Sequence, residues 1–61
     1  MIMKLIKLKD VMNLTSLSRA TIYRFMAQQQ FPKQVVLSAR SVVWRESEII
    51  EWIEEKCAER D

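Results

Sequence analysis

The hydrophobic and polar positions near the C-terminus repeat with the period of a helix. Within Glu46–Ala58 the apolar residues form one stripe at helical spacing: Ile49, Ile53 and Cys57 at its centre, with Ile50 and Trp52 beside them. Glu46 and Glu48 stand in the first turn, where carboxylates complement the helix dipole. The pattern predicts an amphipathic helix with an acidic outer face, in which Cys57 is a small apolar core residue.

In the middle of the chain the period changes to two, which is typical of strands. Residues 35–37 and 42–44 are apolar runs around the polar loop 38–41, and they predict a β-hairpin. A four-residue loop would set three pairs opposite each other: Leu37 and Val42, Val35 and Trp44, and Val36 and Val43. We expect the Trp44 side to face the core. We also expect a longer or strained tip, because Ala39-Arg40 is not a typical tight-turn pair.

Two shorter helical patterns precede the hairpin. The first covers residues 9–14 and is followed by a three-residue break. Ser18 is a good N-cap for a second helix over residues 18–28, which should end before Pro32 because the residue preceding proline disfavours the α region. Four apolar positions could pack the two helices together at a steep angle: Val11, Leu17, Ile22 and Phe25. This spacing is typical of a helix-turn-helix.

Length and composition limit the architecture. The chain has 61 residues, too few for two domains, and 49% hydrophobic with 30% charged residues is a globular balance. We therefore predict a single domain over residues 1–61 with an α+β fold. It is a small winged helix-turn-helix with two short helices, a β-hairpin wing and a C-terminal amphipathic helix.

The residue types exclude most enzyme chemistry. There is no His and no Gly, and Cys57 is the only cysteine, so zinc sites, glycine-rich phosphate loops and nucleophile–histidine sets lack members. We expect no enzymatic activity, no cofactor and no metal. Lys4 interrupts the apolar opening 1–6, so we expect no signal peptide, and no apolar window is long enough to span a membrane. With no disulfide possible within the chain, we expect a cytoplasmic protein.

Charge is divided along the chain. Residues 1–45 carry eight Lys and Arg against the single acid Asp10, a net charge of +7, while residues 46–61 carry seven acids against Lys56 and Arg60, a net charge of −5. A polyanion should therefore meet the first three quarters of the domain. The alternative is a solvated basic surface beside a solvated acidic helix.

The second helix has an outward face suited to DNA. Its members are cations, a hydroxyl, a phenol and small residues that permit close approach to a groove: Ser18, Arg19, Ala20, Tyr23, Arg24 and Ala27. Arg suits bidentate pairing with guanine or phosphate, and Ser18 with the helix N-terminus suits a phosphate. Thr21 is open between a helix-start residue and a phosphate ligand. Tyr23 could instead pack against the hairpin, and both arginines could be ordinary solvated residues.

The hairpin adds two further candidates. Lys33 at its base and Arg40 at its tip are either loop charges or contacts to a neighbouring phosphate or minor groove. The large aromatic residues fall on the inferred apolar faces, and we expect them in the core: Phe25, Phe31, Trp44 and Trp52.

Several runs of this sequence together resemble the AlpA family of phage regulators. They are Leu8-Lys9-Asp10-Val11, Leu14-Thr15-Ser16-Leu17-Ser18-Arg19-Ala20-Thr21-Ile22-Tyr23, Phe31-Pro32-Lys33, and Trp44-Arg45-Glu46-Ser47-Glu48-Ile49 with Trp52. The resemblance implies a winged helix-turn-helix related to excisionases and MerR-type regulators. It also implies binding and bending of attachment-site DNA, excision with an integrase, or control of the integrase promoter. This chain departs from the family where glycine is usual, at Ser16, Gln29, Ser38 and Ala39.

Two functions from different classes remain open at this point. The first is a double-stranded DNA-binding protein of a prophage or genomic island, either an excisionase that assists a tyrosine-recombinase integrase or a transcriptional regulator. We expect it to be a monomer in solution that binds DNA cooperatively and is associated with the bacterial nucleoid. The second is a protein-interaction module that inhibits a partner through the acidic helix and an exposed Val36 and Val43 pair.

Overall fold

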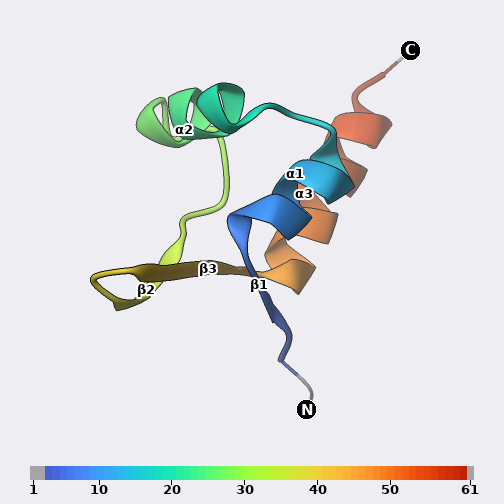
Figure 1. Ribbon diagram of the computed structural model, residues 1–61. Helices are drawn as coiled ribbons and strands as arrows, with labels where there is room; N and C mark the ends of the chain where they lie inside the picture. The colour runs from blue at the N-terminus through green and yellow to red at the C-terminus, as the bar shows by residue number, and fades with distance from the viewer. Residues whose placement is uncertain (1–2, 61) are drawn as a thin grey trace.

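The computed structural model describes residues 3–60; residues 1, 2 and 61 of the predicted domain, and with them part of the opening 1–6, lie outside the described residues. Six elements follow in order: β1 (Leu5–Ile6), α1 (Leu8–Thr15), α2 (Arg19–Ala27), β2 (Val35–Ser38), β3 (Ser41–Arg45) and α3 (Glu46–Ala58). In Figure 1, α1 lies across α3, while α2 and the β2–β3 hairpin, here called the wing, extend to the other side. The predicted α+β winged helix-turn-helix fold is confirmed.

A single left-handed residue turns the chain between α1 and α2. Ser16 has a φ of 60°, and its N–H donates a hydrogen bond to the carbonyl oxygen of Met12 at 2.8 Å. The Thr15 hydroxyl donates to the carbonyl of Val11 and accepts from the N–H of Leu17, which fixes the turn. A residue with a Cβ atom is disfavoured in this conformation. The turn position at which glycine is usual is therefore a strained position in this chain.

The second helix begins and ends where the sequence predicted. The Ser18 hydroxyl accepts a hydrogen bond from the N–H of Thr21 at 3.2 Å, so Ser18 is the N-cap, and Gln28 is the C-cap. The chain then leaves the helix through Gln29, which has a φ of 58°. The N–H of Gln30 donates to the carbonyl of Phe25 at 2.8 Å and closes the helix end. Gln29 is the second left-handed position that carries a side chain.

The wing belongs to a three-stranded antiparallel sheet with the order β1-β3-β2. β1 pairs Leu5 with Arg45 and Ile6 with Trp44, and the N–H of Glu46 donates to the carbonyl of Lys4 at 2.9 Å. The sequence analysis did not predict this third strand. It pairs with the edge of β3 that β2 does not occupy, so β3 is the central strand and β1 and β2 are the two edge strands.

The predicted register of the wing is wrong. The observed partners are Val35 with Val43, Val36 with Val42, and Ser38 with Ser41, with an irregularity between Val36 and Ser38. The turn has two residues, Ala39 and Arg40, so of the two expected alternatives, a longer or a strained tip, the longer tip is wrong. The irregularity in β2 accommodates a short turn without glycine, because an extra residue on one strand bends that strand and increases its twist. Neither tip residue has a positive φ.

The changed register also changes which wing residues are exposed. Val43 is only 5% exposed, whereas Val36 is 63% exposed. The exposed Val36 and Val43 pair that the sequence suggested therefore does not exist: Val43 is buried and stands opposite Val35, while Val36 stands opposite Val42. Trp44 is fully buried, as predicted for the core side, and its indole N–H donates to the carbonyl of Pro32 at 3.2 Å.

The core joins all three helices to the sheet. Its buried members are Ile6, Val11, Ile22, Phe31, Trp44 and Ile49, and Leu17, Phe25, Trp52 and Ile53 pack against them. The prediction that the aromatic residues and the helix-turn-helix apolar positions lie in the core is confirmed. The prediction that Cys57 is a core residue is wrong, because Cys57 is exposed, and Ile50 beside the stripe is 41% exposed. Ile53 is the last residue of α3 that packs against the core, whereas the helix continues to Ala58. The apolar stripe of α3 therefore extends beyond the core.

Candidate nucleic-acid interface

α2 separates apolar and polar residues onto opposite sides. Ile22 is fully buried and Phe25 is half-buried on the inner side, while Arg19, Ala20 and Arg24 are exposed on the outer side. This division follows from the helical period. Ile22 and Phe25 are three residues apart and therefore share one side of the helix, while the exposed residues precede Ile22 or lie between it and Phe25. The outward face predicted from the sequence is therefore present, and packing of Ile22 into the core fixes its direction.

The N-terminus of α2 combines a hydroxyl pair with free backbone donors. The Ser18 hydroxyl donates to the Thr21 hydroxyl at 2.8 Å and accepts from the Thr21 N–H. Because the Thr21 hydroxyl is the acceptor in the first of these bonds, its own proton is not used in that bond. The first intrahelical bond joins the N–H of Ile22 to the carbonyl of Ser18 at 3.0 Å, so the N–H groups of Arg19 and Ala20 precede it. Such an end attracts an anion.

Both arginines of α2 lie over aromatic rings. The guanidinium carbon of Arg19 is 5.9 Å from the centre of the Tyr23 ring, and that of Arg24 is 5.8 Å from the centre of the Phe25 ring. Tyr23 is 37% exposed and lies on the outer side with Arg19 rather than in the core cluster. A cation held against a ring face has fewer conformations to lose on binding. The two guanidinium groups are thereby partly ordered before any ligand arrives.

Lys33 and Arg40 lie outside α2, whereas the other candidate DNA-binding residues belong to α2 or to its N-cap. Lys33 lies in the connection between α2 and β2, and Arg40 lies in the wing tip; both are exposed. Figure 1 shows the wing tip and α2 extending to the same side of the molecule. The structure thus places the α2 candidates on one helix face and Arg40 on a separate projection beside it.

A hollow of 300 Å³ between the end of α2 and the start of β2 contains a residue that the sequence analysis did not single out. Gln34 lines it together with Met26, Gln29, Phe31 and Lys33. The side-chain oxygen of Gln34 is buried and has no hydrogen-bond partner among the described residues. The sequence alone could not predict this, because the burial of a glutamine in a connecting segment depends on how the segments around it pack.

The basic charges on this side are not neutralised within the described part of the chain. Of the eight cations in residues 1–45, one forms an ion pair there: Lys4, with Glu46 at 3.5 Å. Most of the acidic residues belong to α3, which lies beside α1 in Figure 1. The surface around α2 and the wing therefore has a positive potential. Residues 3–60 contain no group of three His, Cys, Asp or Glu side chains placed to hold a metal ion, and none of their helices has the length and apolarity needed to cross a membrane.

Comparison with known proteins agrees with this geometry. Residues 4–57 match the family described as prophage CP4-57 regulatory protein (AlpA). The chain is 37% identical over 57 residues to the uncharacterized protein ORF88 of Enterobacteria phage P4, across 93% of this chain and 65% of that protein. It is 35% identical over 60 residues to the DNA-binding transcriptional activator AlpA of Escherichia coli (strain K12), across 88% of this chain and 86% of that protein.

The first of these relatives is longer, so the chain spans about two thirds of its length, at 65%. The family match covers the helix-turn-helix, the wing and nearly all of α3. The resemblance predicted from the sequence motifs is thereby confirmed. The chain belongs to the AlpA family of prophage regulatory proteins.

Proposed function

We propose that this chain binds double-stranded DNA through α2 and the wing and regulates a prophage or genomic island. The observation that carries the proposal is the outward face of α2. Arg19 and Arg24 are exposed there without an acidic partner among the described residues, next to a helix N-terminus with free donors. A DNA-binding activator among its relatives supports the same reading.

The roles of the α2 side chains follow from their chemistry. α2 enters the major groove, where Arg19 and Arg24 pair with guanine edges or with phosphates. Ser18 and Thr21 with the adjacent N–H groups hold one phosphate and set the depth of the helix. Ala20 is small, so it lets the main chain of α2 approach the groove closely. Tyr23 packs against the Arg19 guanidinium, and its phenol can donate a hydrogen bond to the DNA backbone.

The wing makes the second contact. Arg40 in the tip reaches an adjacent phosphate or the minor groove of the DNA. Lys33 contacts the DNA backbone between the sites bound by α2 and by the wing tip. The two-residue tip is narrow, since Ser38 pairs with Ser41, so Arg40 is the only cation that it presents. The wing therefore adds electrostatic affinity and orientation rather than extended base readout.

Within this class we favour an excisionase over a promoter regulator. One small module contacts about 600 to 1,000 Å² of DNA, which favours several copies on adjacent sites. Such an array bends the attachment region and brings integrase-bound arms together, and the same binding at a promoter would control the integrase gene. We propose a protein that is monomeric at low concentration, acts in the bacterial cytoplasm on the nucleoid, and needs no cofactor. We further propose that it has no catalytic activity.

The test is footprinting of the element's attachment region and of its integrase promoter, with circular-permutation mobility to detect bending. Several adjacent protected sites with a bend in the attachment region support the excisionase role. One unbent site at the promoter would instead support the regulator. An Arg19→Ala/Arg24→Ala variant is the matched control, since it should leave no footprint in either region while keeping the fold.

A further inference from the structure

One side of α3 carries a row of residues in which two apolar members, Ile50 and Cys57, are exposed. Its members are spaced four, three, four and three positions apart: Glu46, Ile50, Ile53 and Cys57 in α3, and Arg60 just after the C-cap Glu59, where the N–H of Arg60 donates to the carbonyl of Cys57 at 3.4 Å. This is the spacing at which one helix packs along another. Ile50 is 41% exposed and Cys57 is exposed, whereas Ile53 is half-buried with the core behind it. We call this set the α3 row.

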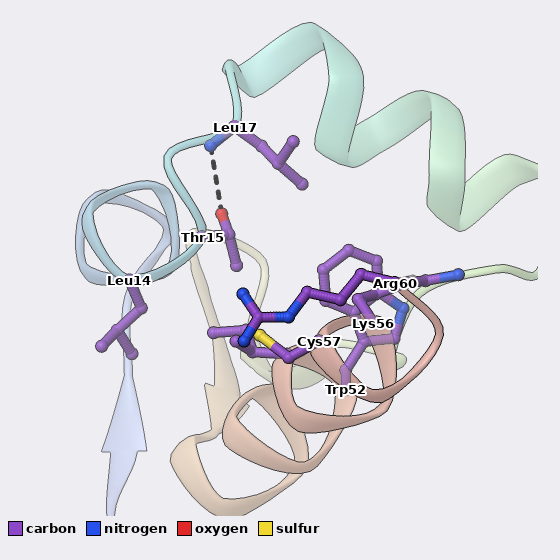
Figure 2. A pocket seen from close by; sticks show the side chains of 8 residues that line it. Leu14, Thr15, Leu17, Trp52, Lys56, Cys57 and Arg60 are labelled. Carbon is purple, nitrogen blue, oxygen red and sulfur yellow. Dashed lines mark hydrogen bonds between the residues drawn. The ribbon is translucent and has the colours of Figure 1, made fainter.

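The row borders a hollow of 330 Å³ between α1 and the C-terminal half of α3. Figure 2 shows Leu14 on the α1 side of this hollow and Cys57 and Arg60 on the α3 side. Leu14 is 44% exposed, so α1 adds apolar surface to that of the row. None of the α2 or wing candidates for DNA binding lines this hollow. The apolar surface is therefore separate from the proposed DNA-binding face.

We propose that the α3 row is the contact surface for a second copy of this chain, packed antiparallel about a two-fold axis at Ile53. Reversing the row sets Ile53 against its own copy, Ile50 against the partner's Cys57, and Glu46 against the partner's Arg60. Each apolar member then meets an apolar member. The charged residue at each end meets the opposite charge, and the partner's Ile50 fills the mouth of the hollow.

Charge selects the antiparallel arrangement. A parallel pair would set Glu46 against Glu46 and Arg60 against Arg60, two like-charge contacts that the antiparallel pair replaces with opposite charges. Glu46 keeps its bond to Lys4 at the surface, where its side chain is 29% exposed and can still accept from a second cation. Glu54 lies beside the row and comes near its own counterpart across the axis, which weakens the contact.

The contact is small and therefore weak. Fewer than four helical turns meet, well short of the area of a stable dimer, so the chain is monomeric at low concentration. On DNA, two copies on neighbouring sites have a high effective concentration, and the contact then adds cooperativity. A two-fold pair requires the two sites to be inverted relative to each other. This last consequence rests on the proposed function, whereas the contact itself does not.

The experiment is disulfide trapping without DNA. An Ile50→Cys variant keeps Cys57 seven residues away on the same helix, about 10.5 Å along its axis, too far for a disulfide within one chain. Oxidation with diamide can therefore join these two thiols only between copies. We expect covalent dimers on a non-reducing gel, and more of them when Glu54→Gln is added, because the repulsion across the axis is removed.

Two matched variants define the background. Glu51→Cys places a thiol on the opposite side of α3, about 9 Å from Cys57 along the helix, and Ile50→Cys/Cys57→Ala removes the expected partner thiol. Both should stay monomeric, as should the parent chain. Equal trapping of Ile50→Cys and Glu51→Cys would overturn the proposal, and so would the absence of dimers in Ile50→Cys. Because DNA is absent, neither result depends on DNA binding.

Discussion

The indole Nε1 of Trp52 on α3 donates a hydrogen bond to the backbone carbonyl of Gln30 at 2.9 Å. The same ring meets Phe31 edge-on with 4.8 Å between centroids, and its centroid lies 6.2 Å from that of Phe25. Gln30 and Phe31 follow α2 directly and lead into the wing. Trp52 therefore connects the acidic helix to the segment that sets the position of the wing relative to α2.

This relationship predicts a graded loss of stability at position 52. Trp52→Ala removes the ring and should cost about 3 to 5 kcal/mol of unfolding free energy. Trp52→Phe keeps most of the packing and loses the indole donor, so it should cost about 1 to 2 kcal/mol. Urea or thermal unfolding followed by circular dichroism measures both. Equal stability of all three proteins would show that Trp52 does not hold the segment after α2.

The two left-handed positions predict stabilising substitutions. Ser16→Gly and Gln29→Gly should each raise the unfolding free energy by about 1 kcal/mol, because glycine adopts a positive φ without a Cβ clash. Ala39→Gly is the matched control, since Ala39 has a negative φ and glycine there only loosens the unfolded chain. The control should leave the unfolding temperature unchanged or lower it. A lower unfolding temperature for Ser16→Gly would contradict the strained turn.

Arg24 offers a test of how α2 reads DNA. Arg24→Ala should weaken binding by about 1 to 3 kcal/mol if the guanidinium contacts a base. Arg24→Lys keeps the charge but loses bidentate geometry, so it should recover phosphate affinity without sequence preference. Gel-shift titrations with the target and a scrambled duplex separate the two effects. Lys56→Ala, which removes one exposed cation from α3, should bind as the parent does.

The wing tip predicts a purely electrostatic loss. Arg40→Ala should lower affinity for target and scrambled duplexes alike and reduce the salt dependence by about one phosphate contact. Its fold should be unchanged, because Arg40 is exposed and outside the paired residues of the wing. Binding isotherms at three salt concentrations give the slope. An unchanged slope would mean that the tip stays away from the DNA backbone.

The sequence predicted the parts of the fold that local chemistry determines. The bounds of α3, the Ser18 cap and the end of α2 before Pro32 follow from helical period, capping and proline sterics. The outward face of α2 follows for the same reason. Of the four positions at which the family usually has glycine, Ser16 and Gln29 have a positive φ, whereas Ser38 and Ala39 do not.

What could not be predicted depends on contacts between distant segments. β1 has only two residues and no period of its own, and it exists because β3 is there to pair with it. The wing register depends on an irregularity in β2 that no residue type signals. Cys57 continues the apolar stripe of α3, but its exposure depends on where α1 and α2 stop covering that helix. The burial of the Gln34 side-chain oxygen depends on the hollow between α2 and β2, which no local pattern predicts.

The central claim is that the basic residues on the outer side of α2 bind DNA. The most direct test is the salt dependence of binding to one attachment-region duplex, measured by fluorescence anisotropy for the parent, Arg19→Ala/Arg24→Ala and Lys56→Ala. The parent and Lys56→Ala should show the same steep decrease of log affinity with log salt, with a slope near −0.9 per phosphate contact. The double variant should bind at least tenfold more weakly with a slope shallower by about two contacts. Parent-like affinity and slope in a folded double variant would contradict the account.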